Sequence, residues 1–321
     1  MAEPKMRLAV ADHDMNMPII DGTVKVDGFE LDITHGTDDG ALHALLREGV
    51  VDAGEYGFST LLRGKVENAP LIAVPAFPNR KFRIGYIFVN ARAGIESPRD
   101  LEGKRVGIPG WGVTACVWAK GALQNYYEVD LTKISWFAPG ADPKQAPEGI
   151  RIQAVKERRD LDPMLASGEL DCVIEPNVLP SITKRDPRVR RLFRDYKAEE
   201  QKYWRETGIF PISHVVTLKR EFVDRNPTAP LALLRAYRQA RDVAFDRVQG
   251  SDPEYLIMSW ASAAIDEQRA VMGDNYWSYN VADNRPTLQA ITQFSHQQGL
   301  TPYQVNYEEF FDPAAAALPG A

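Results

Sequence analysis

Cysteine is scarce in this sequence. Only Cys116 and Cys172 occur in 321 residues, and each lies within an apolar stretch. Such positions are typical of buried core thiols, and neither cysteine has the neighbours that activate a nucleophile. The sequence therefore predicts two free, buried thiols and excludes a disulfide-stapled scaffold.

Long apolar runs are also missing. The N-terminus, MAEPKMRLAVADHD, meets charge at Asp12 after one short strand-like run. It therefore has neither the cationic start and apolar centre of a secretory signal nor a membrane-spanning segment. We expect a cytoplasmic protein rather than an exported one.

An excess of positive charge is missing as well. Lysine and arginine total 38, aspartate and glutamate total 44, and the formal net charge is −6. This balance argues against nucleic-acid and anionic-membrane partners, because both need a basic surface. Any anionic ligand must be held by a local cationic pocket.

The sequence lacks the short motifs of common metal, cofactor and nucleophile sites. It contains no H-E-x-x-H, EF-hand loop, P-loop, G-x-G-x-x-G or G-x-S-x-G segment. Asp12, His13 and Asp14 together could ligate a cation, but adjacent residues of an extended loop point in different directions. We expect no metal and no cofactor.

Short β-rich runs alternate with helical patterns along most of the chain. Strands are expected at 5–11, 29–35 and 51–57, a helix at 38–49, and a second such set from 97–110 onward. This alternation predicts an α/β fold in which mixed, mostly parallel sheets are flanked by helices. The length of 321 residues favours two such lobes.

A weak internal sequence similarity also favours two similar lobes. GVVD at 49–52 and GELD at 168–171 each follow a helical pattern and precede a strand, and their glycines suit left-handed helix C-caps. Farther on, 226–248 has the apolar stripe of one long helix. We expect its arginines to form a solvent-exposed face: Arg235, Arg238, Arg241 and Arg247.

Several segments carry a resemblance to a known family. They include VPAFPNRKFR at 74–83, DLEGKRVGIP at 100–109, TACVWAKGAL at 114–123 and TGIFPISHVV at 207–216, and they run in order along nearly the whole chain. The chain resembles the 4,5-dihydroxyphthalate decarboxylase family, cytoplasmic enzymes with the type II periplasmic-binding-protein fold. Ile84-Gly85 departs from the family pattern, as do residues around His13, which leaves the identity of the aromatic acid open.

The resemblance implies two lobes joined by crossing strands that close over a ligand. Lobe I would comprise 1–92 and 216–321, and lobe II would comprise 93–215, with the ligand cleft between them. The implied ligand is a small aromatic carboxylate. Neither a nucleic acid nor a membrane is implied as a partner, and a homo-oligomer is compatible with this picture.

Three positively charged side chains follow the end of an apolar run. FPNRKFR at 77–83 directly follows APLIAVPA at 69–76, and ligands of open α/β lobes bind at the carboxyl ends of strands. Arg80 and Arg83 are therefore candidates to clamp a carboxylate, and Phe82 to cover an aromatic ring. The alternative is a solvated loop whose arginines pair with surface acids.

Two strand-to-helix turns are further candidates for anion binding. GWGVTACVWAKG at 110–121 places Thr114 at a helix N-terminus, and GEYGFST at 54–60 places Ser59 at another. Ordinary helix capping explains both equally well.

Proton transfer has four candidate residues. His13 and Asp14 follow the first strand, where a carboxylate can orient an imidazole, and His214 lies on an expected crossing strand. Glu175 follows another strand and is a candidate to orient a phenol or imidazole. The alternatives are an exposed turn for His13 and a buried structural role for His214, and His35, His43 and His296 are expected to be structural.

The resulting prediction is a cofactor-independent decarboxylase of a hydroxylated aromatic acid, with 4,5-dihydroxyphthalate giving protocatechuate and CO2. One alternative is a non-catalytic solute-binding protein for an aromatic or pyrimidine-like ligand. Another is a different cytoplasmic enzyme on the same fold, as in menaquinone biosynthesis.

Overall fold

The computed structural model describes residues 3–249 and 256–319. Two compact units account for the chain. Unit 1 comprises Met1–Arg80, Ile212–Leu288 and Asn306–Ala321, and unit 2 comprises Lys81–Pro211 and Gln289–Val305. The lobes implied by the resemblance, 1–92 with 216–321 and 93–215, stay a prediction, as does the cleft between them.

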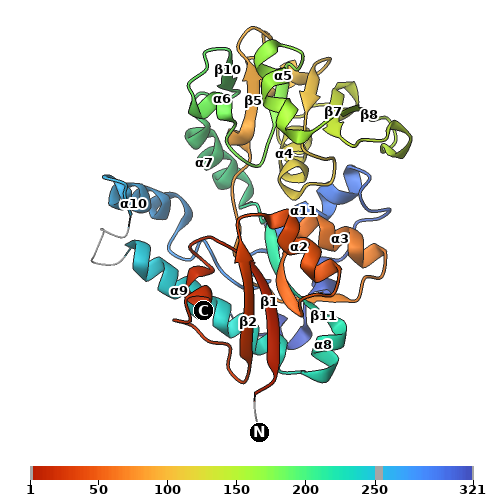
Figure 1. Ribbon diagram of the computed structural model, residues 1–321. Helices are drawn as coiled ribbons and strands as arrows, with labels where there is room; N and C mark the ends of the chain where they lie inside the picture. The colour runs from red at the N-terminus through yellow and green to blue at the C-terminus, as the bar shows by residue number, and fades with distance from the viewer. Residues whose placement is uncertain (1–2, 250–255, 320–321) are drawn as a thin grey trace. The chain divides into compact units, whose positions relative to one another are not determined.

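Unit 1 is built on a five-stranded sheet in the order β2-β1-β3-β11-β4. β1, β2 and β3 are parallel, whereas β11 runs antiparallel to both of its neighbours. Figure 1 shows β1 and β2 side by side. The strands are β1 (Lys5–Ala11), β2 (Glu30–Gly36), β3 (Ala53–Gly57), β4 (Leu71–Ala73) and β11 (His214–Lys219).

Helices occupy the connections of this sheet. They are α1 (Met17–Ile20), α2 (Asp39–Arg47), α3 (Phe58–Val66), α8 (Arg220–Arg225), α9 (Ala229–Gln249), α10 (Ala261–Met272) and α12 (Pro313–Ala316), with a 3-10 helix η7 (Tyr307–Phe310). α11 (Arg285–Gln297) begins in unit 1 and continues into unit 2.

Unit 2 is built on a six-stranded sheet in the order β10-β5-β9-β6-β7-β8. β9, β6, β7 and β8 are parallel, and β5 is antiparallel to β9 and β10. The strands are β5 (Ile87–Asn90), β6 (Arg105–Gly107), β7 (Ser135–Pro139), β8 (Arg151–Val155), β9 (Cys172–Ile174) and β10 (Val189–Arg191). The predicted α/β class with mixed, mostly parallel sheets is confirmed.

The connections of unit 2 are again helical. The α-helices are α4 (Thr114–Asn125), α5 (Leu161–Ser167), α6 (Pro180–Thr183) and α7 (Tyr196–Thr207). Short 3-10 helices are η1 (Ile84–Tyr86), η2 (Pro98–Leu101), η3 (Leu131–Lys133), η4 (Pro143–Gln145) and η5 (Arg158–Asp160). Cys116 on α4 and Cys172 on β9 are free and buried in this unit, as predicted.

The two similar segments, GVVD and GELD, form matching ion pairs in the two units. In unit 1, Arg7 on β1 donates to both carboxylate oxygens of Asp52 through Nε (3.0 Å) and Nη2 (2.7 Å). In unit 2, Arg105 on β6 holds Asp171 in the same way, at 2.9 and 2.7 Å. Gly49 and Gly168, which precede these aspartates, both have positive φ, at 77° and 88°. Each unit therefore fixes the start of one buried strand against the next by the same device.

The exposed arginine face predicted for the long helix is only partly correct. Arg235 is exposed, but Arg238 and Arg241 of α9 are 8% and 5% exposed. The helical period places charged residues on a face, but it does not tell whether a later loop covers that face. Here the segment around Tyr279 lies against α9, because Arg238 donates to its carbonyl oxygen at 2.8 Å through Nη2.

In the part of the chain that the structure describes, no helix is both long and apolar enough to cross a membrane.

Candidate functional site

A buried carboxylate lies at the centre of the unit 1 sheet. Glu55 is the middle residue of β3, where all five positions are buried, and it is 1% exposed. Its strand pairs with β11, whose first residue is His214. A charge in this position is costly unless it is fully paired, so the neighbours of Glu55 define the site.

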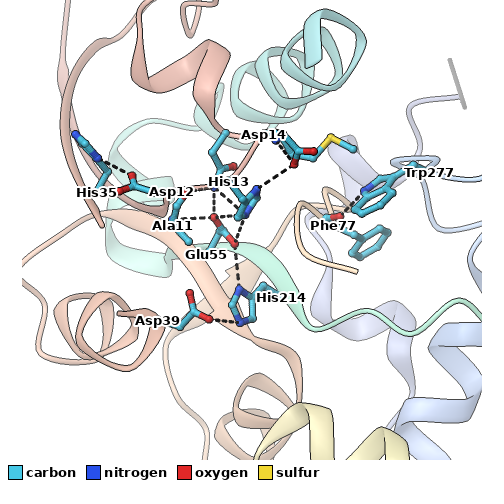
Figure 2. Close-up of polar contacts among 12 residues, drawn as sticks. Ala11, Asp12, His13, Asp14, His35, Asp39, Glu55, Phe77, His214 and Trp277 are labelled. Atoms are coloured by element: carbon cyan, nitrogen blue, oxygen red, sulfur yellow. Dashed lines mark hydrogen bonds and ion pairs between the residues drawn. The ribbon is translucent and has the colours of Figure 1, made fainter. Parts of the chain in front are cut away.

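Two imidazoles hold the Glu55 carboxylate from different elements. His13, in the loop after β1, places Nε2 3.3 Å from Oε2, and His214 places Nδ1 3.1 Å from the same oxygen. Figure 2 shows the carboxylate lying between the two rings. An ionised carboxylate only accepts hydrogen bonds, so the nitrogen of each ring that faces Glu55 carries the proton.

The remaining partners of Glu55 come from the same loop. The backbone N–H of Ala11 donates to Oε1 at 3.0 Å. The side-chain amide of Asn16, which is fully buried, donates to Oε1 and to the Ala11 carbonyl oxygen. The loop that carries His13 is therefore fixed to the carboxylate that His13 contacts.

The charges of this group shift the pKa values of its members in opposite directions. Burial by itself raises the pKa of the Glu55 carboxyl, but the charges and hydrogen bonds of His13 and His214 outweigh it and hold that pKa well below its usual range. Burial by itself lowers the pKa of His13, but the Glu55 charge and hydrogen bond, helped by Asp14 and Asp39, raise it above the ordinary value. At neutral pH, Glu55 is therefore an anion, and its charge favours the protonated form of His13.

The two histidines differ in what else they meet. The His13 side chain is 22% exposed, and its second nitrogen, Nδ1, lies 4.0 Å from a carboxylate oxygen of the exposed Asp14. The His214 side chain is 9% exposed, and its Nε2 lies 3.8 Å from Asp39. The ring of His43 packs edge-on against His214 with centroids 4.8 Å apart. Burial and then the His214 charge lower the pKa of His43 to about 3, so His43 is neutral.

Arg80 lies in a buried part of unit 1 with aromatic neighbours. It is 6% exposed and pairs in an isolated antiparallel bridge with Ile212. Burial lowers its pKa to about 9, and Tyr279 acts on the same group. The guanidinium is thus a cation at neutral pH that has lost most of its water, which favours contact with an anion.

Three aromatic rings pack together in unit 1 around Phe77, which precedes Arg80 by three residues. Phe77 is fully buried and lies edge-on to Tyr279, with centroids 6.4 Å apart, and to Phe311, at 6.1 Å. The indole N–H of Trp277 donates to the Phe77 carbonyl oxygen at 2.9 Å, as Figure 2 shows. The segment that leads to Arg80 is therefore packed against the C-terminal part of unit 1.

The remaining candidates of unit 1 are placed as follows. Ser59 is fully buried in the first turn of α3, whose N-cap, Gly57, offers no side-chain cap. Asp14 accepts a hydrogen bond from the backbone N–H of Met15 at 2.9 Å. His35 forms an exposed pair with Asp12 at 2.7 Å, away from Glu55.

Four predicted site residues belong to unit 2. Arg83 is 7% exposed and donates from Nη1 to the Pro176 carbonyl oxygen at 3.2 Å. Glu175 is buried and forms an ion pair with Arg158. Phe82 lies 4.9 Å from the ring of Phe210. Thr114 begins α4 and is 8% exposed.

Burial raises the pKa of Glu175, and Arg158 opposes the shift. The contribution of these four residues to the site that contains Glu55 stays a prediction.

Glu55, which orients both histidines, was not among the candidate residues predicted from the sequence. His43, which packs against His214, was not among them either. A usable signal existed for Glu55. It is the one charged residue of the short segment GEYGFST, whose other members are apolar or small. A lone carboxylate inside a predicted buried strand needs a partner, and two histidines were available.

Across residues 3–249 and 256–319, His, Cys, Asp and Glu side chains form no group of three or more that is arranged to hold a metal ion.

Comparisons with known sequences confirm the predicted resemblance. The chain is 29% identical over 324 aligned positions to a 4,5-dihydroxyphthalate decarboxylase of Comamonas testosteroni. The alignment covers 98% of both chains. A protein of the same name from Pseudomonas putida is 29% identical over 64% of this chain and 83% of its own. A family described as NMT1/THI5 like matches residues 25–128.

Comparisons with solved structures show the fold. The periplasmic aliphatic sulphonate binding protein SsuA from Escherichia coli matches with a TM-score of 0.58 and 13% identity, covering 97% of this chain and 92% of that one. The alkanesulfonate-binding protein SsuA from Xanthomonas axonopodis pv. citri matches with a TM-score of 0.55 and 13% identity, covering 97% and 99%. The chain therefore has the type II periplasmic-binding-protein-like fold, as predicted.

Proposed function

We propose that this protein is a decarboxylase of a hydroxylated aromatic acid, and that it converts 4,5-dihydroxyphthalate to protocatechuate and CO2. The observation that carries the proposal is the Glu55 carboxylate held between His13 and His214. Such a group orients an imidazole and keeps it protonated, which is what an acid catalyst needs. The substrate is suggested by the names of the two relatives.

The proposed reaction needs one proton at one carbon. A hydroxyl para to the departing carboxylate pushes electron density onto the ring carbon to which that carboxylate is bonded. A proton then adds to this carbon, the bond to the carboxylate breaks, its electron pair restores the aromatic ring, and CO2 leaves. The ring has exchanged a carboxylate for a hydrogen, so the reaction is balanced without an oxidant or a cofactor.

His13 is the better of the two proton donors. Its ring is more exposed than that of His214, and its pKa is raised, so it carries a proton that a bound ring can receive. Nε2 faces Glu55, which leaves Nδ1 as the donor to substrate. After transfer, His13 is neutral and regains a proton from water.

Arg80 is proposed to hold a substrate carboxylate, with Arg83 as a second clamp. We expect Arg80→Ala to lower kcat/KM at least about tenfold, mostly through KM, because a hydrogen bond to a charged group contributes about 1.5–3 kcal/mol. Steady-state kinetics on the single and double alanine variants measure this. The exposed Arg235 of α9 provides a matched control, Arg235→Ala. Unchanged kcat/KM in the Arg80→Ala/Arg83→Ala double variant would show that the clamp is misassigned.

The direct test is incubation of the purified protein with 4,5-dihydroxyphthalate while CO2 and protocatechuate are measured. Release of both in equal amounts is the expected result. The same incubation can be repeated with a set of other aromatic acids. Turnover of one of them without CO2 release would instead indicate a different enzyme on this fold.

A non-catalytic solute-binding protein is the second candidate, because two solved proteins that share the fold are sulfonate-binding proteins. Saturable binding of an aromatic acid in calorimetry, with no CO2 released, would support it. We place the enzyme in the cytoplasm on the resemblance to the decarboxylases. Cell fractionation that finds the protein in the periplasm would favour the binding protein.

A further inference from the structure

Two buried polar side chains of α9 have hydrogen-bonding capacity that the described residues leave unused. Tyr237 is fully buried and Arg241 is 5% exposed. The Tyr237 hydroxyl and Nη1 of Arg241 have no hydrogen-bond partner among the described residues. The two residues are four positions apart on one helix, so their side chains lie on the same face. Leaving a buried donor unpaired costs about 1–3 kcal/mol, so the pair is expected to serve a ligand.

In Arg238, one turn earlier on this helix, all three side-chain nitrogens donate hydrogen bonds. Arg238 donates to the Tyr279 carbonyl oxygen from Nε and Nη2, at 3.1 and 2.8 Å, and to the Pro319 carbonyl oxygen from Nη1 at 2.7 Å. Arg238 thus has a structural role, because it ties the Tyr279 segment to α9. The spare nitrogen of Arg241 is not a general feature of the arginines on this helix.

The orientation of Arg241 is fixed on its other side. Nε and Nη2 both donate to one carboxylate oxygen of Asp242, at 2.9 and 2.7 Å, and the guanidinium lies 5.5 Å from the centre of the Tyr279 ring. One of the two paired-donor edges of the guanidinium, formed by Nε and Nη2, is therefore occupied. One charged N–H-bearing nitrogen and one tyrosine hydroxyl remain.

Tyr237 lies within electrostatic reach of Glu55. Burial raises the pKa of Tyr237, and the Glu55 charge raises it further. Burial also raises the pKa of Tyr279, on which Arg241, Glu55 and Arg80 all act. Contacts also connect Arg241 to the segment of the predicted clamp: its guanidinium lies 5.5 Å from the Tyr279 ring, which packs edge-on against Phe77, three residues before Arg80.

We propose that Nη1 of Arg241 and the Tyr237 hydroxyl bind the ring hydroxyls of the substrate, and that Arg241 stabilises the phenolate form. This proposal rests on the proposed function. A cationic donor beside a hydroxyl that both donates and accepts matches two adjacent ring oxygens, one ionised and one protonated. The phenolate is the form that pushes electrons toward the departing carboxylate.

The test compares the binding of two unreactive ligands that differ only in the hydroxyls, protocatechuate and benzoate. We expect the protein to bind protocatechuate at least about tenfold tighter, and Arg241→Met to remove most of this preference while benzoate affinity changes less than about threefold. Tyr237→Phe should reduce the preference by about two- to tenfold. The control Arg235→Met, on the same helix, should leave both affinities unchanged. Calorimetry gives the affinities.

Absorbance supplies a readout that a structural role would not move. Bound protocatechuate should show the red-shifted band of a catecholate, and Arg241→Met should lose it. Thermal unfolding checks the fold of each variant. The proposal is overturned if Arg241→Met weakens both ligands equally, if the preference persists, or if the protein binds neither ligand. Binding with the expected preference but without CO2 release from 4,5-dihydroxyphthalate would overturn the proposed function and leave this inference standing.

Discussion

Glu55→Gln is expected to lower kcat for decarboxylation by about 10²- to 10⁴-fold, the range of positioned acid–base catalysis. The change keeps the shape of the side chain but removes the charge that both histidines face. Without that charge, burial is opposed only by the more weakly acting Asp14 and Asp39, so the pKa of His13 falls below the wild-type value. A smaller fraction of His13 is then protonated at neutral pH, and the supply of the proton donor falls.

The pH dependence separates this effect from a loss of folding. The rate of the wild-type protein should fall as pH rises through the raised pKa of His13, because only the protonated ring is an acid. In Glu55→Gln, this fall should move to lower pH. The control is Glu67→Gln, an exposed glutamate after α3. A Glu55→Gln protein that keeps its rate within about threefold and its pH profile would contradict the role of Glu55.

His13→Asn is expected to reduce kcat by about 10²- to 10⁴-fold as well, because the variant has no group that can donate a proton to the ring carbon. His214→Asn should have the smaller effect, since the His214 ring is buried behind Glu55 and contacts His43 rather than an open surface. Steady-state kinetics with added imidazole measure this, and imidazole should partly restore His13→Asn but not Glu55→Gln.

The exposed His35 offers the matched control. It pairs with Asp12 and does not contact Glu55, so His35→Asn should keep the wild-type rate. If His214→Asn loses far more activity than His13→Asn, the proton donor is His214, and the assignment of the two rings must be reversed.

Much of the fold was predictable because the hydrophobic periodicity of each segment agrees with the glycines and capping residues at its ends. The strand predicted at 5–11 is β1, and the glycines of the GVVD and GELD segments take the left-handed conformation expected of them. Each such choice depends on residues close in sequence, which is why pattern analysis found them.

The site was predictable only in part because its partners are far apart in the chain. His13 and His214 are each recognisable as candidates from their own segments, but their common partner is Glu55, 42 and 159 positions away from them. Sheet register brings these residues together, and it is not visible in local patterns. The burial of Arg241 depends likewise on a loop near Tyr279 that comes much later.

The most direct test follows 4,5-dihydroxyphthalate labelled with carbon-13 in its carboxyl groups, incubated in heavy water and observed by NMR. The account predicts that the wild-type protein releases one labelled CO2 per molecule and places one deuterium on the vacated ring carbon, and that Glu55→Gln does so at least about a hundredfold more slowly. Saturable binding of the labelled acid with no release of labelled CO2 would contradict the account.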